Sequence, residues 1–400
     1  MKIYEIGGCV RDKLLGKEPS DFDHIIVGAT VDEMLALGFK QVGKAFPVFI
    51  KNGHEYALAR KEIKVGNKHS DFKFIFTPDI TLEEDLTRRD FTCNAIAYDK
   101  ENDRIIDYHS GIADIKNKIL RHVNSDHFPE DPLRVLRMCR FSAQLDFAIA
   151  PETLELASHM VSYGMLSYLS AERIWQEISK ALATPNFDKF ILSMRECGAL
   201  KAILPEVDKM FSTPENTQTH PEGNVGAHAI LAVKYVAKCS PVVKFAALMH
   251  DIGKILTPKE QLPNHTGHEI TGPKIIHDIC LRLKVPNNFK NFAKISCQYH
   301  NNFYHILKIS PEDLYQTLHA LQKYNIDDLL HFFRSDYFGR ALAYPKDKQQ
   351  EKEKFFKKMM DIFKSIKATD MPDFNCISKG ANFKEKLREY TIRIIKENLN

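Results

Sequence analysis

The hydrophobic pattern of the chain changes near residue 115. Before this point, short apolar runs are separated by turn residues, as is typical of strands. The runs that predict strands are residues 2–6, 23–27, 46–51, 55–60 and 105–108. After this point, apolar residues recur at helical spacing. The pattern therefore predicts an α+β protein, with a sheet in its N-terminal part and helices in the rest.

Turn and cap signals locate the ends of several elements. Asn52-Gly53 lies between two expected strands and is a favoured sequence for a type I′ hairpin turn. Residues 12–15 and 30–37 are expected to be short helices, the second with Thr30 as N-cap and Glu33 in the capping-box position. Residues 61–73 are polar and basic. They predict a mobile loop between strands.

In the second part, Ser170 is expected to cap a helix whose apolar face carries Ile174, Ile178 and Leu182. Further helices are predicted at residues 190–194, 228–236, 243–249 and 274–283. Residues 212–226 contain two prolines and two glycines among mostly polar side chains, which predicts a linker.

Charge and cysteine usage narrow the class of protein. The net charge of the 400 residues is +4, too small by itself to indicate a nucleic-acid binder, although residues 341–400 carry 14 Lys/Arg against 9 Asp/Glu. That basic end could contact phosphates, or could be a solvated helix face. The eight cysteines show no CxxC spacing, and no apolar run is long enough to span a bilayer. We therefore expect reduced thiols, no membrane partner and a cytoplasmic location.

The first chemical motif runs from Gly7-Gly8 through Arg11 to the pair Asp21 and Asp23. Glycines allow the backbone to approach a phosphate, and Arg11 offers a planar donor fork for its oxygens. Carboxylates at i and i+2 of a strand share a face, where they can hold a divalent cation such as Mg²⁺. An isolated D-x-D pair is more often a solvated strand end. This context favours attack of a hydroxyl on an α-phosphate.

The second motif is Glu84 to Ala95, which places two arginines next to an acid. Arg89 could bind a triphosphate, while Asp90 and Asn94 could hold a sugar or shape the loop. Composition alone would favour a surface ion-pair cluster on a helix.

The third motif spans Glu130 to Phe141, where Arg134, Arg137 and Arg140 recur every three residues as one basic stripe. Asp131 and Arg134 are neighbours at i and i+3. An acceptor beside a donor matches the pairing edges of cytosine and adenine, whereas uracil and guanine would leave both side chains unpaired. Such a pair could select C and A without a nucleic-acid template.

A fourth motif lies at the end of the apolar segment 243–254, where His250 and Asp251 are adjacent. Adjacent metal-ligand side chains at the edge of a core are unusual. With His228 from an earlier helix and Asp336 from a later one, they could bind a divalent metal that activates water for phosphoester cleavage. A lone histidine, such as His265 or His277, is more often structural.

Taken together, the motifs of the first 210 residues resemble those of the class II tRNA nucleotidyltransferases, the CCA-adding enzymes. The matching motifs, in the family's order, are Gly7-Gly8-x-Val10-Arg11-Asp12 with Leu14-Leu15-Gly16 and Asp21-x-Asp23, then Arg88-Arg89-Asp90 with Asn94-Ala95, then Glu130-Asp131-x-x-Arg134, and then Ser170-x-Glu172-Arg173. Any one of these motifs is modest evidence, but four in register are strong.

The resemblance implies a mixed-sheet nucleotidyltransferase palm (head) over residues 1–117, followed by helical regions. These are a neck and body with the nucleotide-selecting helix at 118–211, a domain at 226–337 and a basic tail at 338–400. It further implies that CTP and ATP are used to add and repair the 3′-CCA end of tRNA, with release of pyrophosphate. By position, Asp21 and Asp23 would be the catalytic Mg²⁺ ligands, and the nucleotide contacts would be Gly8, Arg11, Arg89, Asp131, Arg134, Arg137 and Arg140. A third metal carboxylate has no assignment, with Glu55 one possibility.

The pattern of His228, His250, Asp251 and Asp336 resembles the HD superfamily of metal-dependent phosphohydrolases. A bacterial subgroup of CCA-adding enzymes carries such a domain at this location. For this chain the resemblance implies 2′,3′-cyclic phosphodiesterase, 2′-nucleotidase and phosphatase activities with a divalent metal, Ni²⁺ or Mg²⁺.

Three alternatives remain open from the sequence. A bacterial poly(A) polymerase shares the palm and neck, although such enzymes tend to have more strongly basic tails. A CC-only or A-only adding enzyme would carry nearly the same motifs. An HD hydrolase whose head merely binds RNA is a different class, and the presence of both metal carboxylates argues against it. The sequence leaves monomer and dimer equally open.

Overall fold

The computed structural model describes residues 1–19, 21–42, 48–64, 72–341, 345–372 and 382–399. The chain forms two compact units. The first unit comprises Met1–Ala181 with Lys189–Ile203, and the second comprises Leu182–Asp188 with Leu204–Asn400. Each unit is described by itself below.

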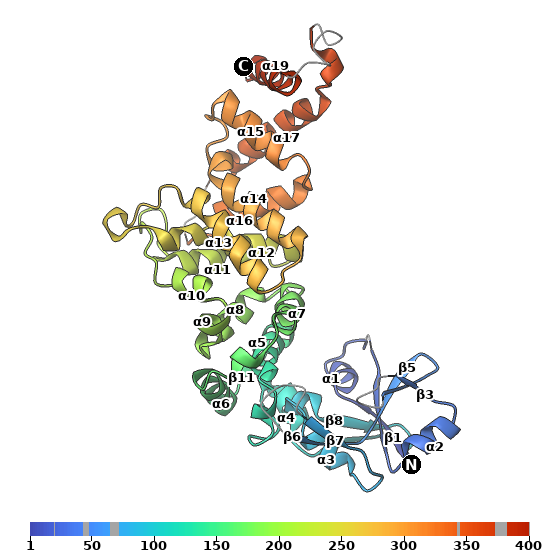
Figure 1. Ribbon diagram of the computed structural model, residues 1–400. Helices are drawn as coiled ribbons and strands as arrows, with labels where there is room; N and C mark the ends of the chain where they lie inside the picture. Colours follow the sequence, from blue (N-terminus) through green and yellow to red (C-terminus); the bar gives the residue numbers. More distant parts are fainter. Residues whose placement is uncertain (20, 43–47, 65–71, 342–344, 373–381, 400) are drawn as a thin grey trace. The chain divides into compact units, whose positions relative to one another are not determined.

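The N-terminal part of the first unit is built on a sheet that has seven strands within the described residues (Figure 1). Its strands are β1 (Lys2–Ile6), β2 (Asp23–Val27), β3 (Lys40–Val42), β4 (Val48–Lys51), β5 (His54–Leu58), β8 (Ile96–Asp99) and β9 (Arg104–Asp107). They lie in the order β3-β4-β5-β2-β1-β8-β9. Strands β2 and β5 are parallel and their other pairings are antiparallel. The predicted mixed sheet is confirmed.

Two helices bury opposite faces of this sheet. On one face, Leu82 and Leu86 of α3 (Leu82–Thr87) pack in a core with Ile6 and Ile25. On the other face, Met34 of α2 (Val31–Ala36) packs with a second core that includes Ile26, Phe49 and Leu58. Consecutive residues of a strand point to opposite faces, so the side chain of Ile25 packs in the first core and that of Ile26 packs in the second. The sheet is therefore covered on both sides.

Several local predictions are confirmed. Asn52 and Gly53 have φ of 52° and 80° and join β4 to β5, as a type I′ turn requires. Thr30 and Glu33 form the expected capping box at α2. Ser170 accepts a hydrogen bond from the Arg173 amide at the start of α7 (Ala171–Leu182).

Other predictions are wrong. The loop expected at 61–73 instead forms a hairpin of β6 (Lys61–Lys64) and β7 (Phe72–Ile75), while residues 65–71 lie outside the described residues. Helix α1 (Gly8–Leu14) begins four residues before the expected start, so Gly8 belongs to its first turn. Strands β3 and β8 and helix α4 (Gly111–Asn117) were not anticipated, and α3 covers only the start of the segment 84–95 for which a helix was one interpretation. Residues 46 and 47 of the expected strand 46–51 also lie outside the described residues.

The remainder of the first unit is helical, as predicted, with one small exception. Its main helices are α5 (Leu133–Leu145), α6 (Pro151–Ser162), α7, α8 (Phe187–Glu196) and α9 (Ala199–Ile203). The exception is a parallel pair of two-residue strands, β10 (Ile119–Leu120) and β11 (Ala148–Ile149). This pair holds the ends of the segment that contains α5.

The regular elements of the second unit are helices within its described residues. Its helices are α10 (Pro205–Met210), α11 (Val225–Tyr235), α12 (Pro241–Met249), α13 (His268–Arg282), α14 (Asn287–Tyr304), α15 (Pro311–Leu321), α16 (Ile326–Phe338), α17 (Lys346–Ser365) and α19 (Phe383–Glu397). Among the described residues, none of the helices combines the length and apolarity required to cross a bilayer.

The segment at 212–226, whose composition predicts a linker, lies within the second unit. Glu215 and His220 are buried. Pro214 and Asn224 form an isolated antiparallel β-bridge, and residues 225 and 226 are the first two residues of α11. Buried polar groups in a loop must find partners, and these partners lie in the second unit, as described below. The segment is therefore part of the packed structure of that unit.

Candidate active sites

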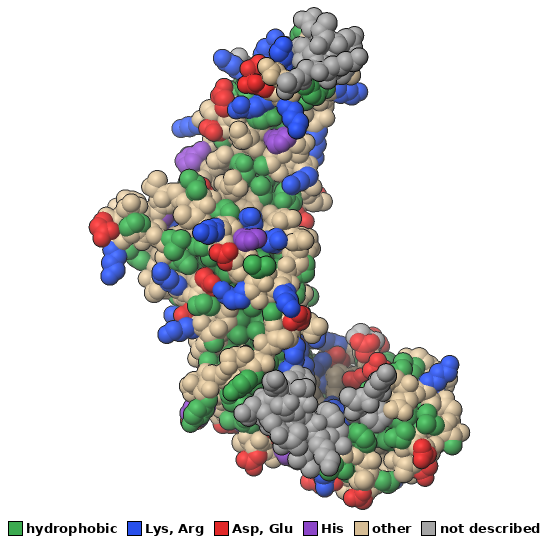
Figure 2. All heavy atoms as spheres, in the orientation of Figure 1, with side chains coloured by type: hydrophobic (Ala, Val, Ile, Leu, Met, Phe, Trp, Pro, Cys, Tyr) green, Lys and Arg blue, Asp and Glu red, His purple; other side chains and the backbone are tan. Residues whose placement is uncertain are grey.

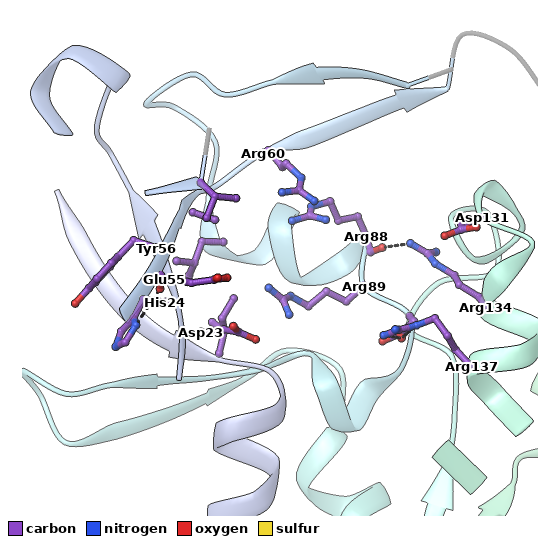
Figure 3. Close-up of a pocket in the computed structure, with 15 residues that line it drawn as sticks. Asp23, His24, Glu55, Tyr56, Arg60, Arg88, Arg89, Asp131, Arg134 and Arg137 are labelled. Carbon is purple, nitrogen blue, oxygen red and sulfur yellow. Dashed lines mark hydrogen bonds and ion pairs between the residues drawn. The ribbon is translucent and has the colours of Figure 1, made fainter. Parts of the chain in front are cut away.

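A cavity of about 330 Å³ opens in the first unit between strands β2 and β5 and the segments around α3 and α5 (Figure 3). Its charged lining consists of five arginines and four acids, namely Arg60, Arg88, Arg89, Arg134, Arg137, Asp23, Glu55, Asp90 and Asp131. Five of the sequence-predicted site residues therefore share this cavity: Asp23, Arg89, Asp131, Arg134 and Arg137. Gly8, Arg11, Asp21 and Arg140 are not among its lining residues.

Two of the four carboxylates of the cavity come from neighbouring parallel strands. Asp23 is the first residue of β2 and pairs in register with Glu55 of β5. Residues opposite each other in a sheet share a face, and Figure 3 shows both side chains directed into the cavity. Asp21 is exposed and precedes the strand instead of lying on it. Oxygen ligands of this kind fit a hard divalent cation such as Mg²⁺.

Glu55 is the residue that sequence reasoning left unassigned. Glu55 lies near Asp23 because β2 and β5 pair in parallel register. In the sequence, strands β3 and β4 lie between β2 and β5. The strand patterns alone contain no signal for that register. The hairpin turn at Asn52-Gly53 places Glu55 near the start of its strand, which is the only local hint.

Arg89 lies opposite these carboxylates. Its Nη1 is 3.4 Å from the Asn94 carbonyl oxygen, its Nη2 is 3.5 Å from Asp85 Oδ2, and its Nε is buried without a hydrogen-bond partner among the described residues. Figure 3 shows its guanidinium directed toward Asp23. Gly7 has a φ of 72°, and a Cβ there would lie 3.2 Å from Arg89 Nη1. A glycine at this position therefore leaves room for the guanidinium. An unpartnered cationic donor at a cavity fits an anionic ligand such as a phosphate.

Hydrogen bonds join three of the sequence motifs into one network. Arg11 Nη1 donates to Asn94 Oδ1 at 2.6 Å, and Asn94 Nδ2 donates to Asp90 Oδ1 at 3.1 Å. Asp90 Oδ2 then accepts from Arg137 Nε and Nη2 at 2.8 and 2.5 Å. Arg11 is itself buried and also paired with Asp12. The network holds the segments that carry Arg89 and Arg137.

The electrostatics of this network are dominated by Asp90. Burial raises the pKa of Asp90, but the Arg137 guanidinium and the hydrogen bonds from Asn94 and Arg137 outweigh it and lower the pKa to about 2. Asp90 is therefore ionised at neutral pH, and its charge offsets that of Arg137.

The proposed selecting pair is held by further contacts. Asp131 Oδ1 accepts from the Leu133 amide at 3.0 Å and its Oδ2 accepts from Arg173 Nη2 at 2.8 Å. Arg134 donates to the carbonyl oxygens of His127 and Arg88, each at 2.6 Å. These contacts orient both side chains at the cavity, and Arg173 belongs to the motif Ser170-x-Glu172-Arg173. Sequence reasoning did not connect Arg173 with Asp131.

Arg140 has different surroundings. Its side chain is buried, its Nε donates to Glu177 Oε2 at 2.5 Å, and its guanidinium carbon lies 4.0 Å from the centroid of the Phe141 ring. The three arginines that recur along α5 therefore have different surroundings. Arg134 and Arg137 reach the cavity, whereas Arg140 ties α5 to α7.

A second site lies inside the helical unit. The four side chains predicted as metal ligands converge there, although they come from three separate segments of the chain. The Nε2 atoms of His228 and His250 are 3.2 Å apart. Asp251 Oδ2 lies 3.2 Å from His250 Nε2, and Asp336 Oδ1 lies 3.4 Å from His228 Nε2. Nitrogen and oxygen atoms at these separations fit around one divalent cation with bond lengths of about 2.1 Å.

The tautomers of both histidines follow from their other contacts. His250 Nδ1 lies 2.9 Å from the Ala247 carbonyl oxygen, and His228 Nδ1 lies 3.1 Å from Glu222 Oε1. These oxygens can only accept, so each Nδ1 carries a hydrogen, and Nε2 is the atom through which each ring, when neutral, would ligate a metal. Both lone pairs point into the site, as metal ligation requires.

Residues that sequence reasoning missed support these ligands. Glu222 accepts from His228 and also from His220 Nδ1 at 3.1 Å. Burial raises the pKa of Glu222, but the hydrogen bonds from His228, its own backbone and His220 lower it to about 2. Lys254 Nζ lies 2.7 Å from Glu215 Oε1 and 2.9 Å from Asp251 Oδ2. The buried polar residues of 212–226 thus find their partners at this site.

The two carboxylate ligands are ionised. Burial raises the pKa of Asp251, but His250 and Lys254 outweigh it and hold the pKa well below its usual range. For Asp336, hydrogen bonding with His228 and the charge of Arg340, whose Nη2 lies 3.1 Å away, likewise lower the pKa against the effect of burial. Both side chains are therefore ready to bind a cation.

Three family models match the chain. They are the poly A polymerase head domain over residues 3–121, the probable RNA and SrmB-binding site of polymerase A over 146–211, and the HD domain over 224–362.

The chain is 44% identical over 351 residues to the multifunctional CCA protein of Vibrio vulnificus, covering 85% of this chain and 86% of that protein. It is 41% identical over 408 residues to the multifunctional CCA protein of Acinetobacter baumannii, covering 99% and 97% of the two chains.

Solved structures share the fold. The Bacillus stearothermophilus CCA-adding enzyme in complex with CTP matches with a TM-score of 0.66 at 23% identity, covering 99% of this chain and 89% of that chain. The Thermotoga maritima CCA-adding enzyme complexed with tRNA matches with a TM-score of 0.62 at 19% identity, covering 99% and 90%.

Proposed function

The chain belongs to the multifunctional CCA proteins, which are CCA-adding tRNA nucleotidyltransferases, and from this premise we propose how its residues divide the work. The first unit would add and repair the 3′-terminal CCA of tRNA, using CTP and ATP without a nucleic-acid template. The observation that carries this proposal is the shared cavity, where Asp23 and Glu55 face Arg89 and the pair Asp131 and Arg134 lies on the same lining.

In the proposed reaction, the 3′-hydroxyl of the RNA attacks the α-phosphate of the nucleotide. The new bond joins that oxygen to the α-phosphorus, the bond from the α-phosphorus to the bridging oxygen breaks, and pyrophosphate leaves. Mg²⁺, held by Asp23 with Asp21 and Glu55, would supply the positive charge that lowers the hydroxyl pKa and stabilises the leaving group. Arg89 would bind the triphosphate through its guanidinium, which lies at the cavity with Asp23 and Glu55.

Base choice would rest on Asp131 and Arg134. Contacts with Arg173 and with two backbone carbonyls hold the pair before any nucleotide arrives. A preoriented acceptor and donor would accept the edges of cytosine and adenine and leave uracil and guanine with unpaired polar groups. Arg137 would add positive charge at the cavity. Gly8 and Arg11 do not line the cavity, and Arg11 would support it through its hydrogen bond to Asn94.

We assign the palm to residues 1–117, the neck and body to 118–211, the hydrolase domain to 226–337 and the tail to 338–400. The tail would contact the tRNA phosphates through its excess of Lys and Arg. The substrate and the unpaired thiols of the seven described cysteines are consistent with action in the cytoplasm.

The second unit would hydrolyse phosphoesters, including 2′,3′-cyclic phosphates, 2′-nucleotides and phosphomonoesters. The supporting observation is the convergence of His228, His250, Asp251 and Asp336 with lone pairs directed inward. A bound divalent metal would polarise the phosphoryl group and activate water. Two imidazole nitrogens in the ligand set favour a transition metal such as Ni²⁺ over Mg²⁺, which prefers oxygen ligands.

The decisive experiment is incubation with tRNA that lacks its 3′ end, Mg²⁺ and each nucleoside triphosphate in turn. Ordered addition of two C and one A supports the proposal. Long A tails would instead support a poly(A) polymerase, addition that stops after CC or requires a CC end would support a partial enzyme, and no incorporation would overturn all three. A phosphodiester assay with Ni²⁺ tests the second unit separately.

A further inference from the structure

The ring of Phe141 lies among three arginine side chains of the first unit. Phe141 belongs to α5 and is 6% exposed. The guanidinium carbon of Arg140 lies 4.0 Å from the centroid of the ring. The corresponding distances are 5.3 Å for Arg137 and 5.5 Å for Arg11. All three are within the range of a cation–π contact, which extends to about 6 Å. One aromatic ring therefore contacts guanidinium groups from both α1 and α5.

Each of the three guanidiniums also has a carboxylate partner of its own. The pairs are Arg11 with Asp12, Arg137 with Asp90, and Arg140 with Glu177. These ion pairs offset the charges, but the guanidiniums remain close to one another. Burial lowers the pKa of Arg140, Glu177 opposes this effect, and the neighbouring charge of Arg137 lowers the pKa further. The guanidiniums of Arg137 and Arg140 therefore repel each other.

The Phe141 ring offsets such repulsion in a way that an aliphatic side chain cannot. The faces of an aromatic ring carry partial negative charge, which attracts a cation without a hydrogen bond. The attraction is stronger where water is excluded, as at this buried position. Phe91 packs against Phe141 with 5.6 Å between the ring centroids and 73° between the ring planes. This edge-to-face contact holds the ring in place.

Two of the three arginines belong to the candidate nucleotide site. Arg137 lines the cavity, and Arg11 donates to Asn94 in the hydrogen-bond network. That network joins Arg11 to Arg137 through Asn94 and Asp90, and Phe141 contacts both of its ends. Hydrogen bonds and ring contacts together therefore determine where the Arg137 guanidinium lies in the cavity wall.

We propose that Phe141 is a positioning residue for triphosphate binding, which holds Arg137 at the cavity through the charge distribution of its ring. Phe141 is not among the lining residues of the cavity, so its effect on a nucleotide passes through Arg137. The inference rests on the proposed function, in which this cavity binds the triphosphate of CTP or ATP. Nucleotide affinity then depends on the electron distribution of a ring that the nucleotide does not touch.

The test replaces Phe141 site-specifically with mono-, di- and trifluorinated phenylalanine in the full-length protein. Fluorine weakens the negative charge of the ring faces stepwise and changes the shape of the ring little. The dissociation constant for CTP in the presence of Mg²⁺ should rise at each step, by about threefold to tenfold for the trifluorinated ring. The turnover number at saturating CTP should stay unchanged, because Arg137 acts on binding.

Phe147 is the matched control. It is 1% exposed in the same unit, and its ring makes no cation–π contact among the described residues. Its fluorination should leave the affinity for CTP unchanged. In Arg137→Gln protein, fluorination of Phe141 should have a much smaller effect on this affinity, because the side chain through which the ring acts is gone.

The position of Arg137 can also be followed without a nucleotide. Weaker attraction by the ring should speed the exchange of the Arg137 Nε proton with solvent, measured by nuclear magnetic resonance. Arg137→Gln identifies this signal by its loss. Affinity for CTP that does not change with fluorination, or a fluorination effect of full size in Arg137→Gln, would overturn the inference. A protein that binds no CTP but shows the accelerated exchange would contradict only the proposed function.

Discussion

Asp90 and Arg137, 47 positions apart in the sequence, are joined by two hydrogen bonds from Arg137 Nε and Nη2 to the single oxygen Oδ2 of Asp90. Asp90 follows α3, whereas Arg137 lies in the middle of α5. Through Asn94 the same carboxylate also reaches Arg11 of α1. One buried carboxylate thus connects three motifs of the first unit.

This pair predicts a loss of stability in acid. The pKa of Asp90 is about 2 in the folded protein, below its ordinary value of 3.8. Ionised Asp90 therefore contributes about 2 kcal/mol to the free energy of unfolding. This contribution is fully present above about pH 4 and is lost as the pH falls toward 2. Urea unfolding at pH 5 and pH 3 should show the stability gap between the unmodified protein and Asp90→Asn shrink by about 1 kcal/mol. An unchanged gap would contradict the ion pair.

Substitution of either carboxylate on the paired strands should stop nucleotide addition. We expect Asp23→Asn and Glu55→Gln each to lower the rate roughly a thousandfold, equivalent to about 4 kcal/mol of transition-state stabilisation. The phosphodiesterase activity of the second unit should remain. Glu101→Gln, at an exposed position of the same unit, is the control. A fully active Glu55→Gln enzyme would remove Glu55 from the site and leave Asp21 as the second ligand.

Asp131→Ala should relax base choice more than it slows addition. Removing the acceptor leaves Arg134 to meet any base, so the preference for CTP and ATP over UTP and GTP should fall by about tenfold to a hundredfold. Competition assays with mixed triphosphates measure this ratio. Arg173→Lys, which retains a cation beside Asp131, should have a smaller effect. Unaltered discrimination in Asp131→Ala would refute selection by this pair.

Gly253, two residues after Asp251, is required by close packing. A Cβ at this position would lie 2.0 Å from the His268 carbonyl oxygen. We expect Gly253→Ala to destabilise the second unit by about 3 kcal/mol, since backbone atoms must move to admit the methyl group. Gly267→Ala is a matched control, because Gly267 has a φ of 81° but open space around it, and should cost about 1 kcal/mol. Thermal unfolding of both variants tests the difference.

Metal removal should destabilise the second unit more than the first. Chelation leaves the excess negative charge around Asp251 and Asp336 uncompensated, and a ligand that binds only the folded state contributes in proportion to its affinity. We expect the unfolding transition of the second unit to shift to lower temperature after chelation and to recover with Mn²⁺ or Ni²⁺. Recovery with Mg²⁺ alone would contradict a nitrogen-rich metal site.

The sequence by itself determined features that depend on neighbouring residues. The Asn52-Gly53 turn, the Thr30 capping box and the strands at Lys2–Ile6 and Asp23–Val27 were predictable, because backbone preferences and short-range hydrogen bonds set them. The loop expected at 61–73 instead contains strands β6 and β7, whose pairing with each other is a contact between separate segments that the local composition does not encode.

Only the tertiary structure decided which chemical groups meet. The register of β2 against β5 brings Glu55 beside Asp23, while packing separates Arg140 from the cavity that Arg134 and Arg137 reach. In the second unit, segments distant in sequence bring the four proposed metal ligands together. These relations arise from contacts between distant segments, which no local spacing encodes. The sequence therefore determined which residue types were available, and the fold determined how they are combined.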